Sequence, residues 1–115
     1  MKKILIINSS KETMLLLERW LERKEYNVKF TTHLEEVVDI VKEFEPQLII
    51  IDIDQKEVIP AIKTYDSSLL LLLMTGYTRV NVYSDLTVDD IIEKPFTLEL
   101  LEQKVDQLMT DVVES

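Results

Sequence analysis

Leu48-Ile49-Ile50-Ile51-Asp52 is the stretch that decides the fold. Its four consecutive apolar residues leave no polar face, so a strand made from them must be covered on both sides. The runs Ile4–Ile7 and Leu69–Met74 have the same character. Strands of this kind are typical of a parallel sheet that lies between two layers of helices.

Helical periodicity fills the segments between these runs. Leu34, Val37, Val38 and Val41 recur at i, i+3, i+4 and i+7, and Pro46 follows them as a stop signal. Two further strands are predicted, an alternating one at Val28–Thr31 and a brief one at Ile91-Ile92. A short helix is predicted at Glu57–Tyr65, with Pro60 in its first turn. The first and last helices are indicated by residues that fall on one side of each: Met14, Leu17, Trp20, Leu21 and Lys24 in the first, and Leu98, Leu101, Val105, Leu108 and Val112 in the last.

This alternation of five strands and five helices predicts a doubly wound α/β domain. We expect a five-stranded parallel sheet in the flavodoxin-like order 2-1-3-4-5, with helices on both faces. The alternating second strand and the short fifth strand suit the edges of that sheet. We also expect residues 1–115 to form a single stand-alone domain, without an effector domain after the last helix.

Composition narrows the range of partners. Of 115 residues, 22 are acidic and 13 are Lys or Arg, which gives a formal net charge of −9. Such a charge repels phosphate backbones and anionic lipid, so we expect no binding to nucleic acid or membranes. No cysteine is present, and the apolar run Ile4–Ile7 is too short for a signal core or a membrane span. These features predict a cytoplasmic protein.

Polar residues follow several of the predicted strands. Ligands of doubly wound sheets bind beyond the carboxyl ends of the strands, near the switch in strand order. This rule selects Asn8 and Ser9 after the first strand, Asp52 after the third and Thr75 after the fourth. These residues define the candidate site.

The candidate site has chemistry suited to a phosphoryl group. A carboxylate at Asp52 is a potential nucleophile, and Lys94 after the fifth strand can neutralise phosphoryl oxygens. Thr75 can donate a hydrogen bond, while Gly76 lets the backbone approach closely. Asp52 and Lys94 are each the obvious countercharge of the other, so we expect them to form an ion pair.

At Asp52, Thr75 and Lys94-Pro95-Phe96 the chain resembles a response-regulator receiver domain of the CheY-like family. The ordered set covers essentially the whole chain. The resemblance implies a signalling domain of two-component systems rather than an enzyme, with a histidine kinase or a downstream effector as partner. It implies that Asp52 is the phosphoacceptor, Thr75 with Gly76 the switch position, and Lys94 the phosphate-binding lysine, positioned by a cis peptide bond before Pro95.

The resemblance also implies acidic Mg²⁺ ligands after the first strand, where this chain has Asn8 and Ser9. The remaining metal site is a degenerate set of Asn8, Ser9, Asp52 and Asp54. Removing two unit charges about 4 Å from a dication costs several kcal/mol of attraction even at an effective dielectric near 20. Magnesium dehydrates reluctantly and needs carboxylates, so we expect it to bind weakly if at all, and we expect no other cofactor.

Two helix starts have the sequence of a capping box, with a hydroxyl residue three positions before Glu. Ser9 precedes Glu12, and Thr32 precedes Glu35. We therefore predict that Ser9 caps the first helix and Thr32 the second. His33, the only histidine, then falls in a loop, and Trp20 belongs to the core.

Features tied to switching in this family are also altered. The stretch 53–57 lacks the M-P-x-M-D-G pattern, residues 76–90 are short for a complete helix, and Ile91 stands where an aromatic switch residue is usual. We therefore predict an atypical receiver that signals through a fixed surface. The predicted contact residues are Tyr77, Tyr83, Glu99, Gln103 and Asp106.

Two other functions and one assembly remain open. Asp52 could be a working phosphoacceptor, with Asp54 or Glu12 replacing the missing acids. Alternatively, the chain could be a flavodoxin-like FMN electron carrier whose phosphate loop is 8–13, a segment that opens a helix but lacks glycine. A homodimer is also possible.

Overall fold

The computed structural model describes residues 2–8, 11–76, 88–94 and 96–110. In chain order the elements are β1 (Lys3–Ile7), α1 (Lys11–Arg23), β2 (Asn27–Thr31), the 3₁₀ turn η1 (Leu34–Glu36), α2 (Val37–Phe44), β3 (Leu48–Asp52), the 3₁₀ segment η2 (Ile53–Val58), α3 (Ile59–Tyr65), β4 (Leu70–Thr75), β5 (Asp90–Glu93) and α4 (Leu98–Met109).

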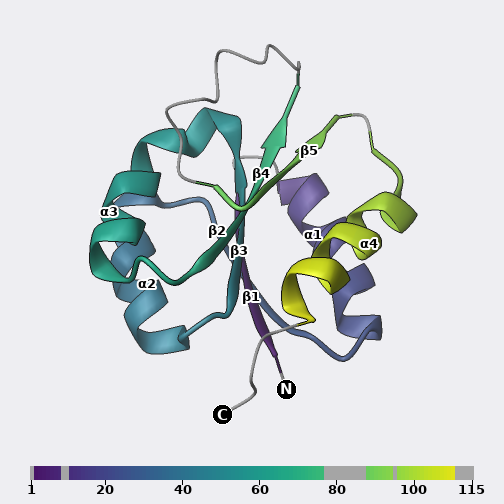
Figure 1. The fold of residues 1–115 in the computed structure, drawn as a ribbon, viewed down its shortest axis with the longest axis horizontal. Coiled ribbons are helices and arrows are strands. Elements are labelled where there is room, and N and C mark those ends of the chain that lie inside the picture. The colour runs from purple at the N-terminus through teal and green to yellow at the C-terminus, as the bar shows by residue number, and fades with distance from the viewer. Residues whose placement is uncertain (1, 9–10, 77–87, 95, 111–115) are drawn as a thin grey trace.

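The five strands form one parallel sheet in the order β2-β1-β3-β4-β5 (Figure 1). This is the predicted 2-1-3-4-5 topology, with the alternating strand β2 at one edge and the short strand β5 at the other. The prediction of a doubly wound α/β fold is confirmed. Because every strand runs in the same direction, the residues that end them meet at one edge of the sheet.

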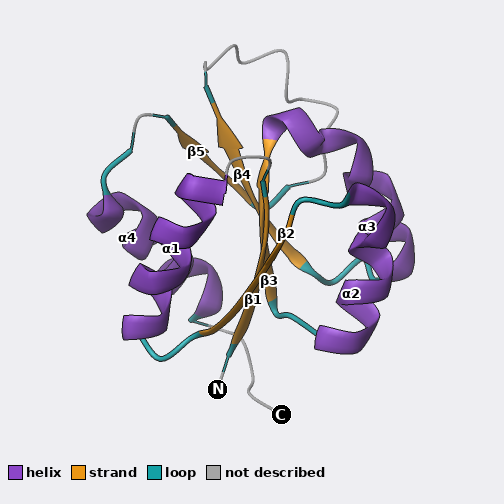
Figure 2. Cartoon of the chain, turned by 180° about the vertical axis from the view of Figure 1, so that it is seen from behind, coloured by secondary structure: helices purple, strands orange, loops and turns teal. Residues whose placement is uncertain are grey.

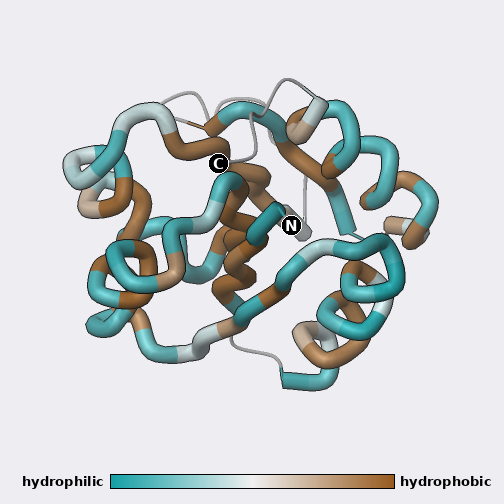
Figure 3. Tube along the Cα trace, turned by 90° about the horizontal axis from the view of Figure 1, so that it is seen from below, coloured by the Kyte–Doolittle hydropathy of each residue, from teal (hydrophilic) through white to brown (hydrophobic). Residues whose placement is uncertain are grey.

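In the described part of the chain, two helices cover each face of the sheet. α1 and α4 lie on one side, and α2 and α3 lie on the other (Figures 1 and 2). Alternate strand residues serve the two layers: Ile4, Ile6 and Ile50 pack toward α1 and α4, whereas Leu5 and Ile49 pack toward α2 and α3. Figure 3 shows the resulting hydrophobic strands at the centre of the molecule. Trp20 packs against the first of these clusters, as predicted.

Local sequence explains how the helices begin and end. Pro60 lies in the first turn of α3, where its missing N–H costs no helical hydrogen bond. Thr97 caps α4 by accepting a hydrogen bond from the Leu100 N–H at 3.1 Å. α2 ends at Glu45, which has left-handed backbone angles (φ 54°). These signals fix the directions in which the chain enters and leaves the sheet.

The predicted capping box at the second helix is wrong. His33 occupies the N-cap position of η1 and makes no side-chain cap. The hydroxyl that organises this turn belongs to Thr31, whose Oγ1 accepts a hydrogen bond from the His33 N–H at 3.1 Å. An i to i+2 bond of this kind starts the turn one residue before Thr32. His33 is an exposed residue ahead of the helix, as expected.

Other sequence predictions fall outside the described residues. They include the cap at Ser9 and the irregular helix between β4 and β5, because residues 9–10 and 77–87 are not described. Within the part of the chain that is described, no helix has the length and apolar character needed to cross a membrane.

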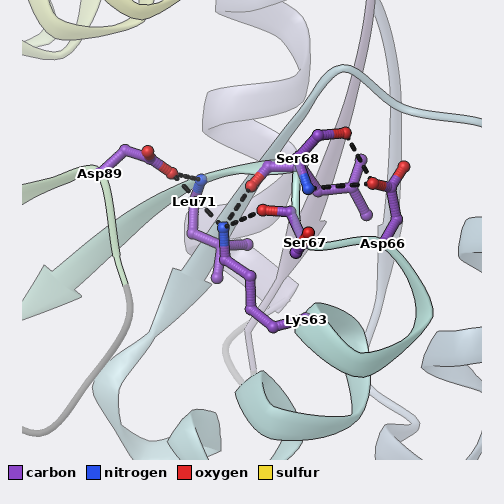
Figure 4. A network of polar contacts seen from close by, with 7 residues as sticks. Lys63, Asp66, Ser67, Ser68, Leu71 and Asp89 are labelled. Atoms are coloured by element: carbon purple, nitrogen blue, oxygen red, sulfur yellow. Dashed lines mark hydrogen bonds and ion pairs between the residues drawn. The ribbon is translucent and has the colours of Figure 1, made fainter.

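A polar network joins α3 to the amino ends of β4 and β5 (Figure 4). The Lys63 ammonium donates to the Leu69 carbonyl at 2.7 Å and lies 3.9 Å from the Asp89 carboxylate. Asp89 Oδ2 in turn accepts from the Leu71 N–H at 2.8 Å, and the Asp89 N–H donates to the Leu71 carbonyl at 2.9 Å. The network therefore holds β5 in place at the edge opposite the candidate site.

Candidate functional site

The polar residues of the candidate site lie at the carboxyl edge of the sheet, where Thr31 also ends β2. Asn8 follows β1, Asp52 and Thr75 are the last residues of β3 and β4, and Lys94 follows β5 directly. The central three are almost wholly buried, with exposed fractions of 2 % for Asn8 and Asp52 and 0 % for Thr75. Polar side chains at this depth are unusual without a structural or chemical role. The structure therefore places Asn8, Asp52 and Thr75 at one edge, which are the residues selected by the strand-end rule that lie within the described part of the chain.

Both Asp52 carboxylate oxygens have partners. Oδ1 accepts a hydrogen bond from the Asp54 N–H at 3.0 Å, which makes Asp52 the N-cap of η2. Oδ2 accepts a charged hydrogen bond from the Lys94 ammonium. The predicted ion pair between Asp52 and Lys94 is confirmed. A buried carboxylate with these two donors is held in one orientation at the end of the strand.

The backbone of β5 sets the position of Lys94. Its N–H donates to the Thr75 carbonyl at 2.6 Å, continuing the β4–β5 pairing by one residue. Its side chain is 39 % exposed, whereas that of Asp52 is 3 % exposed. Lys94 thus reaches from the surface into the site, and its ammonium remains within reach of an incoming anion.

The Thr75 hydroxyl can form a hydrogen bond that the described structure does not use. Its Oγ1 is buried and has no hydrogen-bond partner among the described residues. A hydroxyl left in this state costs free energy, about 1–3 kcal/mol for a buried group. Gly76 follows as an exposed residue, and a Cβ added there would meet no atom within 4 Å. The hydroxyl is therefore available to a ligand, while nothing described here requires glycine at position 76.

Gln55 is a residue that sequence reasoning missed. It lies in η2, has φ −106° and ψ 19° within an otherwise helical segment, and has a buried Oε1 without a partner in the described structure. The only available signal was its place three residues after Asp52. By contrast, Asp54 is exposed, and it contacts Asp52 through its backbone N–H.

The structure describes only some of the other residues that were predicted to have a role. Ser9, Pro95, Tyr77 and Tyr83 lie outside the described residues, so their predicted roles remain predictions. Glu99, Gln103 and Asp106 are exposed on α4, but the Asp106 carboxylate accepts a hydrogen bond from the Tyr26 hydroxyl at 2.7 Å. Burial of the Tyr26 hydroxyl raises its pKa, and the hydrogen bond to Asp106 raises this pKa further. Asp106 therefore has an internal partner.

The family model for the response regulator receiver domain matches residues 4–106. The chain belongs to this family. Receiver domains are signalling domains of two-component systems and interact with histidine kinases and effectors. This membership replaces the flavin-carrier alternative, and it agrees with the CheY-like resemblance carried by Asp52, Thr75 and Lys94.

Solved structures of similar fold include TrrA from Thermotoga maritima in complex with Mg²⁺ and BeF, at 26 % identity and a TM-score of 0.81, covering 94 % of this chain and 99 % of that one. A two-component response regulator from Clostridium difficile has 24 % identity and a TM-score of 0.87, with 96 % and 98 % covered. CheY4 of Vibrio cholerae has 18 % identity and a TM-score of 0.86, with 94 % and 98 % covered.

Proposed function

We propose that this receiver domain is an atypical member that signals through protein contact on a fixed surface, with a site that binds Mg²⁺ weakly or not at all. The observation that carries the proposal is the charge at the strand ends. Asp52 is paired with Lys94, so their charges cancel, and the neighbouring buried position holds the amide Asn8. A dication gains little attraction from a neutral site.

The residues present do not fit the metal that the family implies. Among the described residues, no group of three or more His, Asp or Glu side chains is placed to hold a metal ion. Asp54 directs only its N–H to Asp52, and Ser9 cannot supply a carboxylate. Since Mg²⁺ relies on carboxylates to offset the cost of losing water, weak binding is the expected behaviour.

A second function has its own support. Asp52, Lys94 and the Thr75 hydroxyl are at the sheet edge, and the hydroxyl has no partner in the described structure. These groups could still hold a phosphoryl group without the metal's full contribution. In that case Asp52 would form an acyl phosphate as the donor's bond to phosphorus breaks.

Incubation with acetyl phosphate and Mg²⁺, followed by intact-mass measurement, separates the two functions. The proposed function predicts no phosphorylated species over many hours, and the matched control Asp52→Asn should behave identically. Accumulation of one phosphoryl group in the parent protein, absent from Asp52→Asn, would establish the phosphoacceptor function instead. A histidine kinase or an effector remains the expected partner class, and the cytoplasmic location remains a prediction.

A further inference from the structure

Helix α1 carries an exposed apolar stripe on the side that faces away from the core. Its buried residues are Met14, Leu17 and Leu21. Leu15 and Leu16 lie on the other side, with 47 % and 57 % of their surface exposed. Only four large hydrophobic side chains are exposed in the described part of the chain, and two of them are these neighbours. The fold therefore leaves about half of each of these two side chains uncovered.

The stripe ends in opposite charges. Glu12, Leu15, Leu16 and Arg19 recur at i, i+3, i+4 and i+7, so they share one side of the helix. Together they line a surface depression of about 310 Å³. Leu16 also lines a second depression of about 310 Å³, which runs toward Lys94 and Phe96. The apolar surface therefore has an acidic residue at one end and a basic residue at the other, and it borders the depression that Lys94 of the candidate site also lines.

We propose that this stripe binds a second copy of the chain through antiparallel packing of α1 on α1. A twofold axis that passes between Leu15 and Leu16 places position 12 of one protomer opposite position 19 of the other. Glu12 then faces the partner's Arg19, and Arg19 faces the partner's Glu12. The leucines meet at the centre. The charge order along the stripe is therefore self-complementary, as a closed twofold interface requires.

The ion pairs and the leucine contacts of this interface contribute differently to its affinity and its orientation. Exposed ion pairs contribute little affinity, typically about 0.2–1 kcal/mol each. Burial of Leu15 and Leu16 supplies most of the driving force, and the charges fix the antiparallel direction. A net charge of −9 on each protomer opposes association. We expect a reversible dimer that forms at high protein concentration, and a mass that stops at the dimer because the symmetry is closed.

Analytical ultracentrifugation over a wide concentration range tests the dimer, at about 0.15 M salt, where the Debye length is near 8 Å. The parent protein should change from monomer to dimer as concentration rises. Leu16→Ser should remain monomeric. Tyr65→Ser is the matched control, since Tyr65 is 45 % exposed but lies on α3, across the sheet. A parent protein that is monomeric at every concentration would overturn the proposal, as would dimerisation unaffected by Leu16→Ser.

A charge exchange tests the symmetry itself. Arg19→Glu makes both ends of the stripe acidic, and Glu12→Arg makes both basic, so each variant should dimerise roughly thirtyfold more weakly than the parent, as two attractive pairs become repulsive. An equimolar mixture of the two variants should associate again, because every pair in the mixed dimer is attractive. Failure of the mixture to associate, with both variants folded by circular dichroism, would refute the antiparallel arrangement.

The outcome of these dimerisation experiments does not depend on whether Asp52 is phosphorylated. A monomeric protein leaves the proposed function intact, and phosphorylation of Asp52 leaves the dimer intact. Since Leu16 borders the depression lined by Lys94, a dimer would place the partner close to the carboxyl edge of the sheet.

Discussion

The two ends of strand β4 carry polar clusters of opposite character. At the amino end, Lys63 contacts two backbone carbonyls and Asp89, and the Asp89 carboxylate also accepts from the Leu71 N–H. At the carboxyl end, Thr75 has a buried hydroxyl without a partner in the described structure. Lys63 and Asp89 are therefore both paired at the amino end, whereas the Thr75 hydroxyl at the carboxyl end can still form a hydrogen bond.

This difference separates a structural cluster from a candidate site. Buried groups that are fully paired stabilise one arrangement, and a group left without a partner costs stability that a ligand can restore. Asp52 strengthens the contrast because it is almost wholly buried, whereas Asp89 is half-buried. The most informative experiments therefore change one end and use the other as a control.

The largest effect should come from restoring acids at the carboxyl end. The double variant Asn8→Asp with Ser9→Asp should raise Mg²⁺ affinity by roughly a hundredfold or more, because two charges are added about 4 Å from the ion. Calorimetric titration should show saturation in the variant at low millimolar metal and none in the parent. Adding Asp52→Asn to the variant should remove the response. Tight binding by the parent would refute the account of a degenerate site.

Removing the lysine at each end should have unequal costs. Lys94→Met leaves the buried Asp52 carboxylate without its countercharge, and we expect a loss of about 2 kcal/mol of unfolding free energy, below the usual value for a buried pair because Lys94 is 39 % exposed. Lys63→Met should cost only about 1 kcal/mol, because it removes bonds to neutral carbonyls and leaves an Asp89 carboxylate that is 35 % exposed, rather than a buried charge. Urea denaturation at pH 7 measures both. Equal losses would remove the distinction between the two ends.

The sequence predicts the sheet and the strand-end residues well because these depend on strong local signals. Runs such as Leu48–Ile51 permit few arrangements, and parallel pairing then brings Asp52, Thr75 and Lys94 together. The start of the second helix was predicted incorrectly because the hydroxyl oxygens of Thr31 and Thr32 are both plausible acceptors for a backbone N–H of the turn, and only backbone geometry selects Thr31. The network around Lys63 was missed because its partners include backbone carbonyls, which every residue has.

Replacing the Thr75 hydroxyl should stabilise the protein. Thr75→Val keeps the β-branched shape that a strand favours and removes a buried polar atom without a described partner. We expect a gain of about 1 kcal/mol in unfolding free energy, measured by urea denaturation. Thr31→Val is the matched control: Thr31 is also buried at a strand end, but its hydroxyl accepts from His33, so this variant should lose stability. Loss of stability in Thr75→Val would show that the hydroxyl is already satisfied.

The smallest effect concerns pH at the amino end. The Ser68 hydroxyl and N–H both donate to Asp66, at 2.6 and 2.9 Å, and these bonds hold the Asp66 pKa below its ordinary value of 3.8. Because the folded-state pKa is the lower one, this stabilisation is complete above pH 3.8 and is lost as pH falls through the folded-state value. Both bonds lie at the exposed surface, so the contribution should be only about 0.3 kcal/mol. The unfolding free energy of the parent should therefore fall slightly more between pH 6 and pH 3 than that of Asp66→Asn. Ser68→Ala, which removes one of the two bonds, should fall between them, and an identical pH dependence in all three proteins would show that the bonds between Ser68 and Asp66 contribute nothing to stability.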